Sequence, residues 1–179
     1  LQAPVWSKNL TKNSVRGGVV YTHPIVTQNS VIYRYRNMLF CRSILNGELR
    51  WKNDLGGRVK WQNWRAVQWP QEDVVVQDGL VFTPMNKIGP SLVAIDEITG
   101  ELKWAYGPIQ ASTREQAKTR ILAPPAAGPR AVYAGYVYDD IEGETHTDTQ
   151  YGVIAFEAST GRVLWQTLLC WLQPGKLVG

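Results

Sequence analysis

A phrase of about fourteen residues that occurs three times constrains the fold of this chain more than any other feature. Residues 92–104 and 152–165 carry full copies, in which a short apolar run leads to an acidic residue, a Thr-Gly turn and a tryptophan. A worn copy lies at residues 38–51. In every copy the glycine precedes the tryptophan by four residues: Gly47 and Trp51, Gly100 and Trp104, Gly161 and Trp165. Self-similarity at this spacing predicts a repeat architecture.

Each copy follows other apolar runs that are separated by turn residues. Val31–Tyr35 has the β-branched and aromatic residues of a strand, and Asn46-Gly47 and Asp78-Gly79 are hairpin signals. Each unit reads as four short antiparallel strands, and the tryptophans of successive copies are 53 and 61 residues apart, because loops lengthen the roughly 40–50 residues typical of a propeller blade. This pattern predicts an all-β β-propeller. We expect about three blades and an extra strand around Trp6.

The spacing of strands and loops gives a set of expected boundaries. We expect blades at residues 23–53, 73–106 and 122–167. Residues 1–22 would hold the last strand of a preceding blade and a connection, 54–72 and 107–121 the inter-blade loops, and 168–179 the start of the next connection. Ser112-Thr113-Arg114-Glu115 has the spacing of a capping box, so a short helix is expected over residues 116–122.

Charge and cysteine content exclude several classes of protein. The net charge is +4, and no run of Lys and Arg exceeds two residues, so a solvated surface is favoured over nucleic-acid binding. No apolar run reaches the length of a membrane span. Only two cysteines occur, and Cys41 stands where the full copies have alanine, which predicts a small buried core residue. The first residue is not methionine, so we expect a mature chain or a piece of a longer one.

The repeated phrase resembles the tryptophan-docking motif of the quinoprotein β-propellers. That group includes the pyrroloquinoline-quinone-dependent dehydrogenases and the outer-membrane-assembly lipoprotein relatives. The residues that carry the resemblance are Ala94, Asp96, Thr99, Gly100 and Trp104, then Ala155, Glu157, Thr160, Gly161 and Trp165, and in the worn copy Cys41, Gly47 and Trp51. The resemblance implies a larger propeller of seven or eight blades, and hence completion by further blades or by other chains.

The physical chemistry of the phrase favours a structural role for these residues. Glycine after threonine permits a positive φ in a tight turn, and an acid near the turn can accept hydrogen bonds from backbone N–H groups. The tryptophan can bury its ring on the next blade, where the small Ala leaves room. Any binding site is therefore expected on the opposite face, where most of the long loops lie.

Two groups of residues on that face are candidate sites. The loop at residues 54–72 interleaves tryptophans with cations, and a ligand or partner surface is expected at Arg58, Trp61, Trp64, Arg65 and Trp69, with packing onto the loop's own blade as the alternative. The polar loop expected at residues 139–150 offers carboxylates for Ca²⁺ at Asp139, Asp140, Glu142 and Asp148, with a solvated loop as the alternative.

The resemblance leaves two functions open. One is an extracytoplasmic, periplasmic propeller that acts as a binding or assembly module without a cofactor. The other is part of a quinone-dependent dehydrogenase that oxidises alcohols or sugars with pyrroloquinoline quinone and Ca²⁺. The adjacent cysteine pair that many such enzymes carry is absent here, and no calcium ligand or catalytic base can be assigned.

Overall fold

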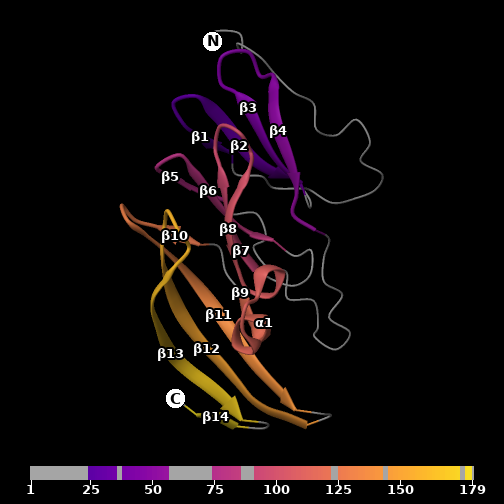
Figure 1. The fold of residues 1–179 in the computed structure, drawn as a ribbon, viewed down its shortest axis with the longest axis vertical. Helices are drawn as coiled ribbons and strands as arrows, with labels where there is room; N and C mark the ends of the chain where they lie inside the picture. The colour runs from indigo at the N-terminus through magenta and orange to yellow at the C-terminus, as the bar shows by residue number, and fades with distance from the viewer. Residues whose placement is uncertain are drawn as a thin grey trace.

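The computed structural model describes residues 24–35, 38–56, 74–85, 91–121, 125–142, 145–173 and 176–178. Three antiparallel sheets, here called blades 1 to 3, follow one another along the long axis of the molecule (Figure 1). Within each blade, strands adjacent in sequence pair with one another. The nearly all-β architecture confirms the predicted fold class, and the three sheets form an open part of a propeller.

The first two blades are four-stranded meanders. Blade 1 consists of β1 (Ile25–Val26), β2 (Ser30–Tyr35), β3 (Met38–Ser43) and β4 (Leu49–Asp54). Blade 2 consists of β5 (Val75–Gln77), β6 (Leu80–Met85), β7 (Ser91–Asp96) and β8 (Leu102–Tyr106).

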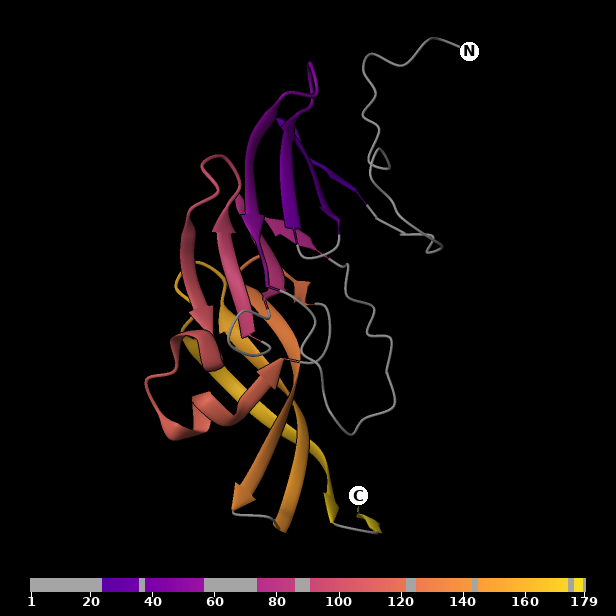
Figure 2. The ribbon, with the colours of Figure 1, turned by 90° about the vertical axis from the view of Figure 1, so that its right-hand side faces the viewer.

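Blade 3 is larger than the sequence predicts. It consists of β9 (Thr119–Ile121), β10 (Ala126–Ala127), β11 (Ala131–Glu142), β12 (Thr145–Glu157), β13 (Val163–Gln173) and β14 (Lys176–Val178). The edge strand that precedes β11 is divided in two, because β9 and β10 both pair with β11. The long strands β11 to β13 extend well below the other blades in Figure 2.

The prediction of a polar loop at residues 139–150 is wrong, because most of these residues belong to the long strands β11 and β12. Asp139 pairs with Thr149 and Asp140 with Asp148 in an antiparallel ladder whose register shifts just after Asp140. Thr145, Thr147 and Thr149 alternate along this stretch, and β-branched residues at every second position favour a strand even where their neighbours are polar. β13 likewise runs on to Gln173, where the sequence predicts a connection from residue 168.

The predicted helix exists but begins earlier and is shorter. α1 spans Arg114–Lys118, follows the 3-10 helix η1 (Pro108–Gln110), and leads directly into β9. The hydroxyl of Thr113, rather than Ser112, accepts a hydrogen bond from the backbone N–H of Gln116 at 3.1 Å. Thr113 therefore caps the helix, which begins at Arg114, two residues before the predicted start at residue 116. After Lys118 the chain continues as β9, which pairs with β11.

In every blade, hydrogen bonds join the two tight turns at one end of the sheet. Backbone N–H groups of the turn between the third and fourth strands donate to carbonyls of the turn between the first and second: Ile44 to Asn29, Glu97 to Gly79, and Ala158 to Arg130. These turns therefore share one face of the molecule. Gly47, Gly100 and Gly161 have φ near +70°, a conformation that glycine adopts without steric cost.

Two hydrophobic clusters lie between the blades and share blade 2. Val81, Val93 and Ile95 face blade 1, where they pack with Ile32, Leu39 and Trp51. Their neighbours along the strands, Phe82, Leu92 and Ala94, face blade 3, where they pack with Val132, Ile154 and Phe156. Because successive side chains of a strand point to opposite faces, a middle blade must be apolar on both. This explains the nearly continuous apolar sequence of β7.

Trp51 and Trp104 each lie over the turn of the next blade. The Trp51 indole N–H donates to the carbonyl of Glu97 at 2.8 Å, and the Trp104 indole N–H donates to the carbonyl of Ala158 at 2.9 Å. Both rings are buried, and each lies against the turn glycine of that blade, Gly100 or Gly161. Trp104 also lies between Phe82 and Phe156, with ring centroids 5.8 Å from each.

Trp165 occupies the same position in blade 3 but has no following blade among the described residues. It pairs with Ala155 across the sheet, as Trp104 pairs with Ala94. Its exposed fraction is 47%, against 7% for Trp104. Its ring instead contacts Tyr133, with centroids 5.9 Å apart.

Replacing the two equivalent tryptophans with alanine should therefore have unequal effects. Trp104→Ala removes a buried ring and its hydrogen bond, and should lower the free energy of unfolding by about 3–5 kcal/mol. Trp165→Ala loses chiefly its contact with Tyr133, and should cost about 0.5–1.5 kcal/mol. Urea denaturation of the 179-residue chain measures both. Equal losses would contradict the assignment of Trp104 as the inter-blade contact.

Two glycines with similar backbone angles offer a matched test of the contact between turn and tryptophan. A Cβ atom at Gly161 would lie 2.5 Å from a ring atom of Trp104, whereas a Cβ at Gly79 would meet nothing within 4 Å. Both have positive φ. Gly79→Ala should cost about 1–2 kcal/mol of backbone strain. Gly161→Ala should cost about 1–3 kcal/mol more, because the ring must move. Thermal denaturation of the two variants compares them directly, and similar losses would show that the ring gives way freely.

The turn carboxylate of blade 2 should make stability depend on acid pH. Asp96 accepts hydrogen bonds from the N–H groups of Thr99 at 2.9 Å and Ile98 at 3.0 Å, and lies 3.3 Å from the Lys103 ammonium. The bond from Thr99 contributes most to holding the pKa of Asp96 below its ordinary value.

A folded-state pKa below the unfolded value, about 3.9 for Asp, means that ionised Asp96 stabilises the fold above that pH. This contribution is lost as the pH falls through the folded-state pKa. Asp96→Asn should therefore be less stable than the original chain at pH 7, and the gap should close in acid. Urea denaturation from pH 7 to pH 2.5 checks this, and a gap that stays constant would rule out the carboxylate as its source.

Candidate functional site

The structure brings two of the four residues predicted to bind Ca²⁺, Asp140 and Asp148, opposite each other on β11 and β12. Arg58, Trp61, Trp64, Arg65 and Trp69 lie outside the described residues. Of the four acidic candidates, the structure describes only the backbone, which places Asp139, Asp140 and Glu142 on β11 and Asp148 on β12. Both groups stay predictions.

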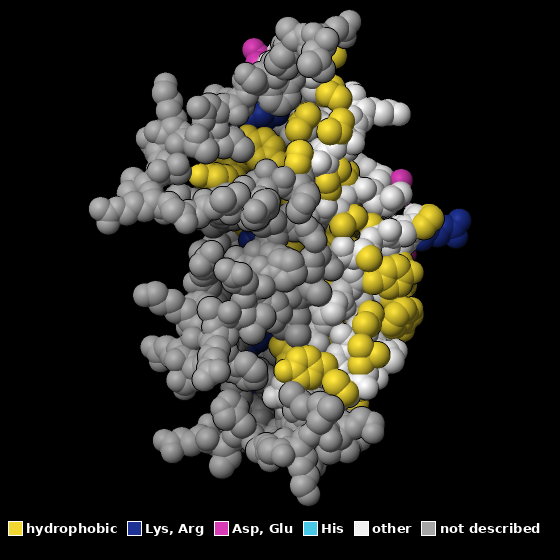
Figure 3. Space-filling model, turned by 180° about the vertical axis from the view of Figure 1, so that it is seen from behind, with side chains coloured by type: hydrophobic (Ala, Val, Ile, Leu, Met, Phe, Trp, Pro, Cys, Tyr) yellow, Lys and Arg dark blue, Asp and Glu magenta, His cyan; other side chains and the backbone are white. Residues whose placement is uncertain are grey.

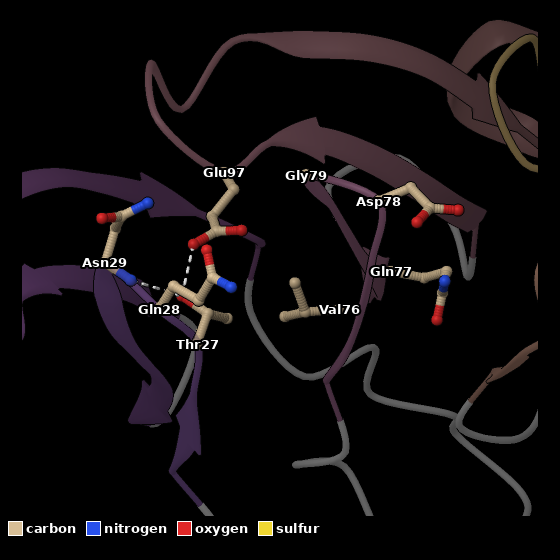
Figure 4. A pocket seen from close by; sticks show the side chains of 8 residues that line it. All are labelled: Thr27, Gln28, Asn29, Val76, Gln77, Asp78, Gly79 and Glu97. Atoms are coloured by element: carbon tan, nitrogen blue, oxygen red, sulfur yellow. Dashed lines mark hydrogen bonds between the residues drawn. The ribbon is translucent and has the colours of Figure 1, made fainter.

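A cleft of about 420 Å³ instead lies between blades 1 and 2, on the face that carries the tight turns (Figure 4). One wall is the β1–β2 turn, the other is the β5–β6 hairpin, and Glu97 comes from the β7–β8 turn of blade 2. The lining residues are Thr27, Gln28, Asn29, Val76, Gln77, Asp78, Gly79 and Glu97. Volumes of about 300–1,000 Å³ are usual for small-molecule clefts.

Glu97 is the residue through which the two blades meet. Its exposed fraction is 8%, and its carboxylate accepts a hydrogen bond from the Thr27 hydroxyl of blade 1 at 2.5 Å. Its backbone carbonyl accepts from the Trp51 indole at 2.8 Å and lies 3.6 Å from the Cys41 sulfur. Its own N–H donates to Gly79. Glu97 is thus held through its backbone by Trp51 and Gly79 and through its carboxylate by Thr27.

Both walls of the cleft are ordered by local turn chemistry. The Thr27 hydroxyl oxygen accepts hydrogen bonds from the backbone N–H groups of Asn29 and Ser30, so its single hydrogen is available for Glu97. Asp78 and Gly79 have φ of +49° and +75°, as a two-residue hairpin turn of the primed type requires. The rigid turns place amide and carboxylate side chains around the opening.

The lining residues that the structure describes include two with carboxylates, Asp78 and Glu97, and no lysine or arginine. Arg50 of β4 donates to the hydroxyl of Ser30 at 3.0 Å rather than to Glu97. Next to the cleft, burial raises the pKa of the Cys41 thiol above its ordinary value, against the opposing effect of its hydrogen bond with Ser30. The thiol is therefore protonated near neutral pH, and the cleft is a polar, negatively charged recess without a nucleophile of its own.

Sequence reasoning directed the search to the long loops and did not find this cleft. One signal could have indicated it. The position after the turn acid holds Ile44 in the worn copy and Ala158 in the third, but a glutamate in the second. A charged residue where the repeat has apolar ones, in a segment that packs against a neighbouring blade, needs a polar reason for its presence.

The quinone and calcium chemistry that the resemblance implies finds no fitting set of residues in the described part of the chain. There, His, Cys, Asp and Glu side chains nowhere gather in a group of three or more that could hold a metal ion. Among the described residues, no helix has the length and apolar character that crossing a membrane requires.

Comparisons with known proteins place the chain in a family. No curated protein matches it. A solved europium-containing methanol dehydrogenase is similar over 81% of this chain and 24% of its own, with 16% identity and a TM-score of 0.53. BamB from Moraxella catarrhalis is similar over 80% of this chain and 50% of its own, with 17% identity and a TM-score of 0.42.

The chain therefore spans about a quarter of the first protein and half of the second. At these identities the likeness to the dehydrogenase concerns the fold alone. The family model described as outer membrane protein assembly factor BamB matches residues 2–169, nearly the whole sequence. The chain belongs to this BamB family of propeller repeat proteins.

Proposed function

We propose that this chain is part of an extracytoplasmic β-propeller that works as a binding and assembly module, completed by further blades of its own protein or of other chains. Family membership supports both the location and the role, since the family is described as an outer membrane assembly factor. The tryptophan-rich loop with Trp61, Trp64 and Trp69 stays a predicted partner surface on the opposite face from the tight turns.

The observation that carries the proposal is the uncovered face of blade 3. Hydrophobic side chains gather along one edge of the molecule in Figure 3. On the side away from blade 2, Tyr133 and Trp165 lie in register with Ala155 and are 37% and 47% exposed. Further apolar residues of β13, which point to both sides of the sheet, are 38% to 66% exposed: Val163, Leu164, Leu168 and Leu169. Contiguous apolar surfaces of this kind mark interaction sites.

The contacts between blades 1 and 2, and between blades 2 and 3, indicate which structure would cover the open face of blade 3. Trp51 of blade 1 and Trp104 of blade 2 are each covered by the glycine turn of the next blade, and a backbone carbonyl of that turn accepts the indole hydrogen bond. A further blade with a positive-φ glycine at the same turn would give Trp165 the same partners. Assembly by successive identical contacts is the usual way in which repeat proteins complete their cores.

Comparing the isolated chain with the native, assembled protein tests the proposal. In the 179-residue chain, acrylamide should quench Trp165 fluorescence readily, with Trp165→Phe identifying its share of the signal. In the assembled protein that quenching should be lost, and Trp165→Ala should destabilise as strongly as Trp104→Ala. Leu45→Ala, at an exposed turn of blade 1, is the control and should change neither measurement.

Two results would contradict the proposal. One is a native protein whose mass equals that of the lone chain and in which Trp165 stays accessible to acrylamide. The other is a purified native protein with quinone absorbance that reduces dye when alcohols or sugars are added, which would support the dehydrogenase alternative instead.

A further inference from the structure

Among the described residues, no cation pairs with the buried carboxylate of Glu97. Only a neutral hydroxyl, that of Thr27, donates to it among the described residues, and that bond occupies one oxygen. Buried charges are normally paired, because an uncompensated charge away from water is costly. Glu97 is thus 8% exposed, and no described residue donates to its second carboxylate oxygen.

The second oxygen of Glu97 faces the cleft. In Figure 4 it points away from Thr27, toward the open space between the two walls. Asp78 lies on the opposite wall and adds a second negative charge at the rim, although in Figure 4 its carboxylate and the Gln77 amide point away from Glu97. The described lining carries two negative charges and no lysine or arginine, and a negatively charged recess attracts a positively charged donor.

The donor set suits an organic cation better than a metal ion. Ca²⁺ takes about 6–8 oxygen ligands that converge on one point, usually with several carboxylates among them. The cleft has two, which come from separate turns, and they do not form a metal-binding cluster. A guanidinium has five N–H donors spread over a plane, so it can bond a carboxylate on one side and amide carbonyls on the other.

We propose that the cleft between blades 1 and 2 binds the guanidinium group of an arginine side chain presented by a partner protein, with Glu97 as its principal anchor. The anchor is pre-positioned, because Trp51, Thr27 and Gly79 already hold its backbone and one carboxylate oxygen. Binding therefore has to order little of the Glu97 side chain, and a lower entropic cost of ordering favours affinity. This inference holds whether or not the uncovered face of blade 3 receives another blade.

The probe for the test is the peptide acetyl-Gly-Arg-Gly-amide, titrated into the 179-residue chain and followed by the NMR amide signals of Gly79 and Glu97. The matched control ligand has citrulline in place of arginine, which keeps the shape and removes the charge. The arginine peptide should saturate these shifts, and raising the salt concentration should weaken it. The citrulline and lysine peptides should bind at least tenfold more weakly.

Three variants locate the site. Glu97→Gln keeps an acceptor for Thr27 but removes the charge, and should weaken the arginine peptide at least tenfold. Asp78→Asn should weaken it about threefold, and Asn tolerates the positive φ at this position. Glu101→Gln neutralises a carboxylate of the same turn whose side chain is 73% exposed, and should leave the affinity unchanged.

Several outcomes would overturn the proposal. Citrulline or lysine peptides that bind as tightly as the arginine peptide would refute recognition of a guanidinium. Glu97→Gln that melts like the original chain and binds equally well would refute the anchor. If that variant does not fold, unchanged binding in Asp78→Asn would refute the site. Displacement of the peptide by 1 mM CaCl₂ at constant ionic strength would assign the cleft to a metal.

Discussion

The hydrogen bond from a tryptophan indole to a carbonyl of the next blade is the interaction on which this structure depends. It combines a large apolar contact with a directional bond, so neighbouring sheets are fixed in distance and in rotation. A glycine beneath the ring makes the close approach possible, since a Cβ at Gly100 or Gly161 would overlap the indole. Each blade therefore carries both halves of the contact, the ring on its fourth strand and its acceptor turn between the third and fourth.

The same contact organises polar chemistry at the junction of blades 1 and 2. Trp51 bonds the Glu97 carbonyl, and this brings the Glu97 side chain against the first turn of blade 1. At the next junction the acceptor is Ala158, whose side chain offers no polar group. Two geometrically equivalent junctions thus differ in character because of one residue. Inter-blade packing gives the framework, and a single departure from the repeat makes one junction a charged recess.

Much of the fold follows from local sequence. The turns are predictable because Thr-Gly and Asp-Gly have strong conformational preferences, and the blade faces because apolar residues repeat in register. The extension of β11 and β12 was missed because composition alone makes residues 139–150 resemble a polar loop, although the alternating threonines favour a strand. The cleft was missed because Thr27 and Glu97 are 70 residues apart and meet only through the stacking of two sheets.

The blades do not share equally in the core. Blade 2 is covered on both faces, and its central strand β7 is buried along nearly its whole length, whereas the β13 face of blade 3 is open. In a linear array of repeats, local stability is the sum of what each unit and its neighbours contribute. Transient opening of this segment should therefore start at the open edge and reach the middle sheet last. Amide protons of β7 would then report global unfolding, while those of β13 would report fraying of one unit.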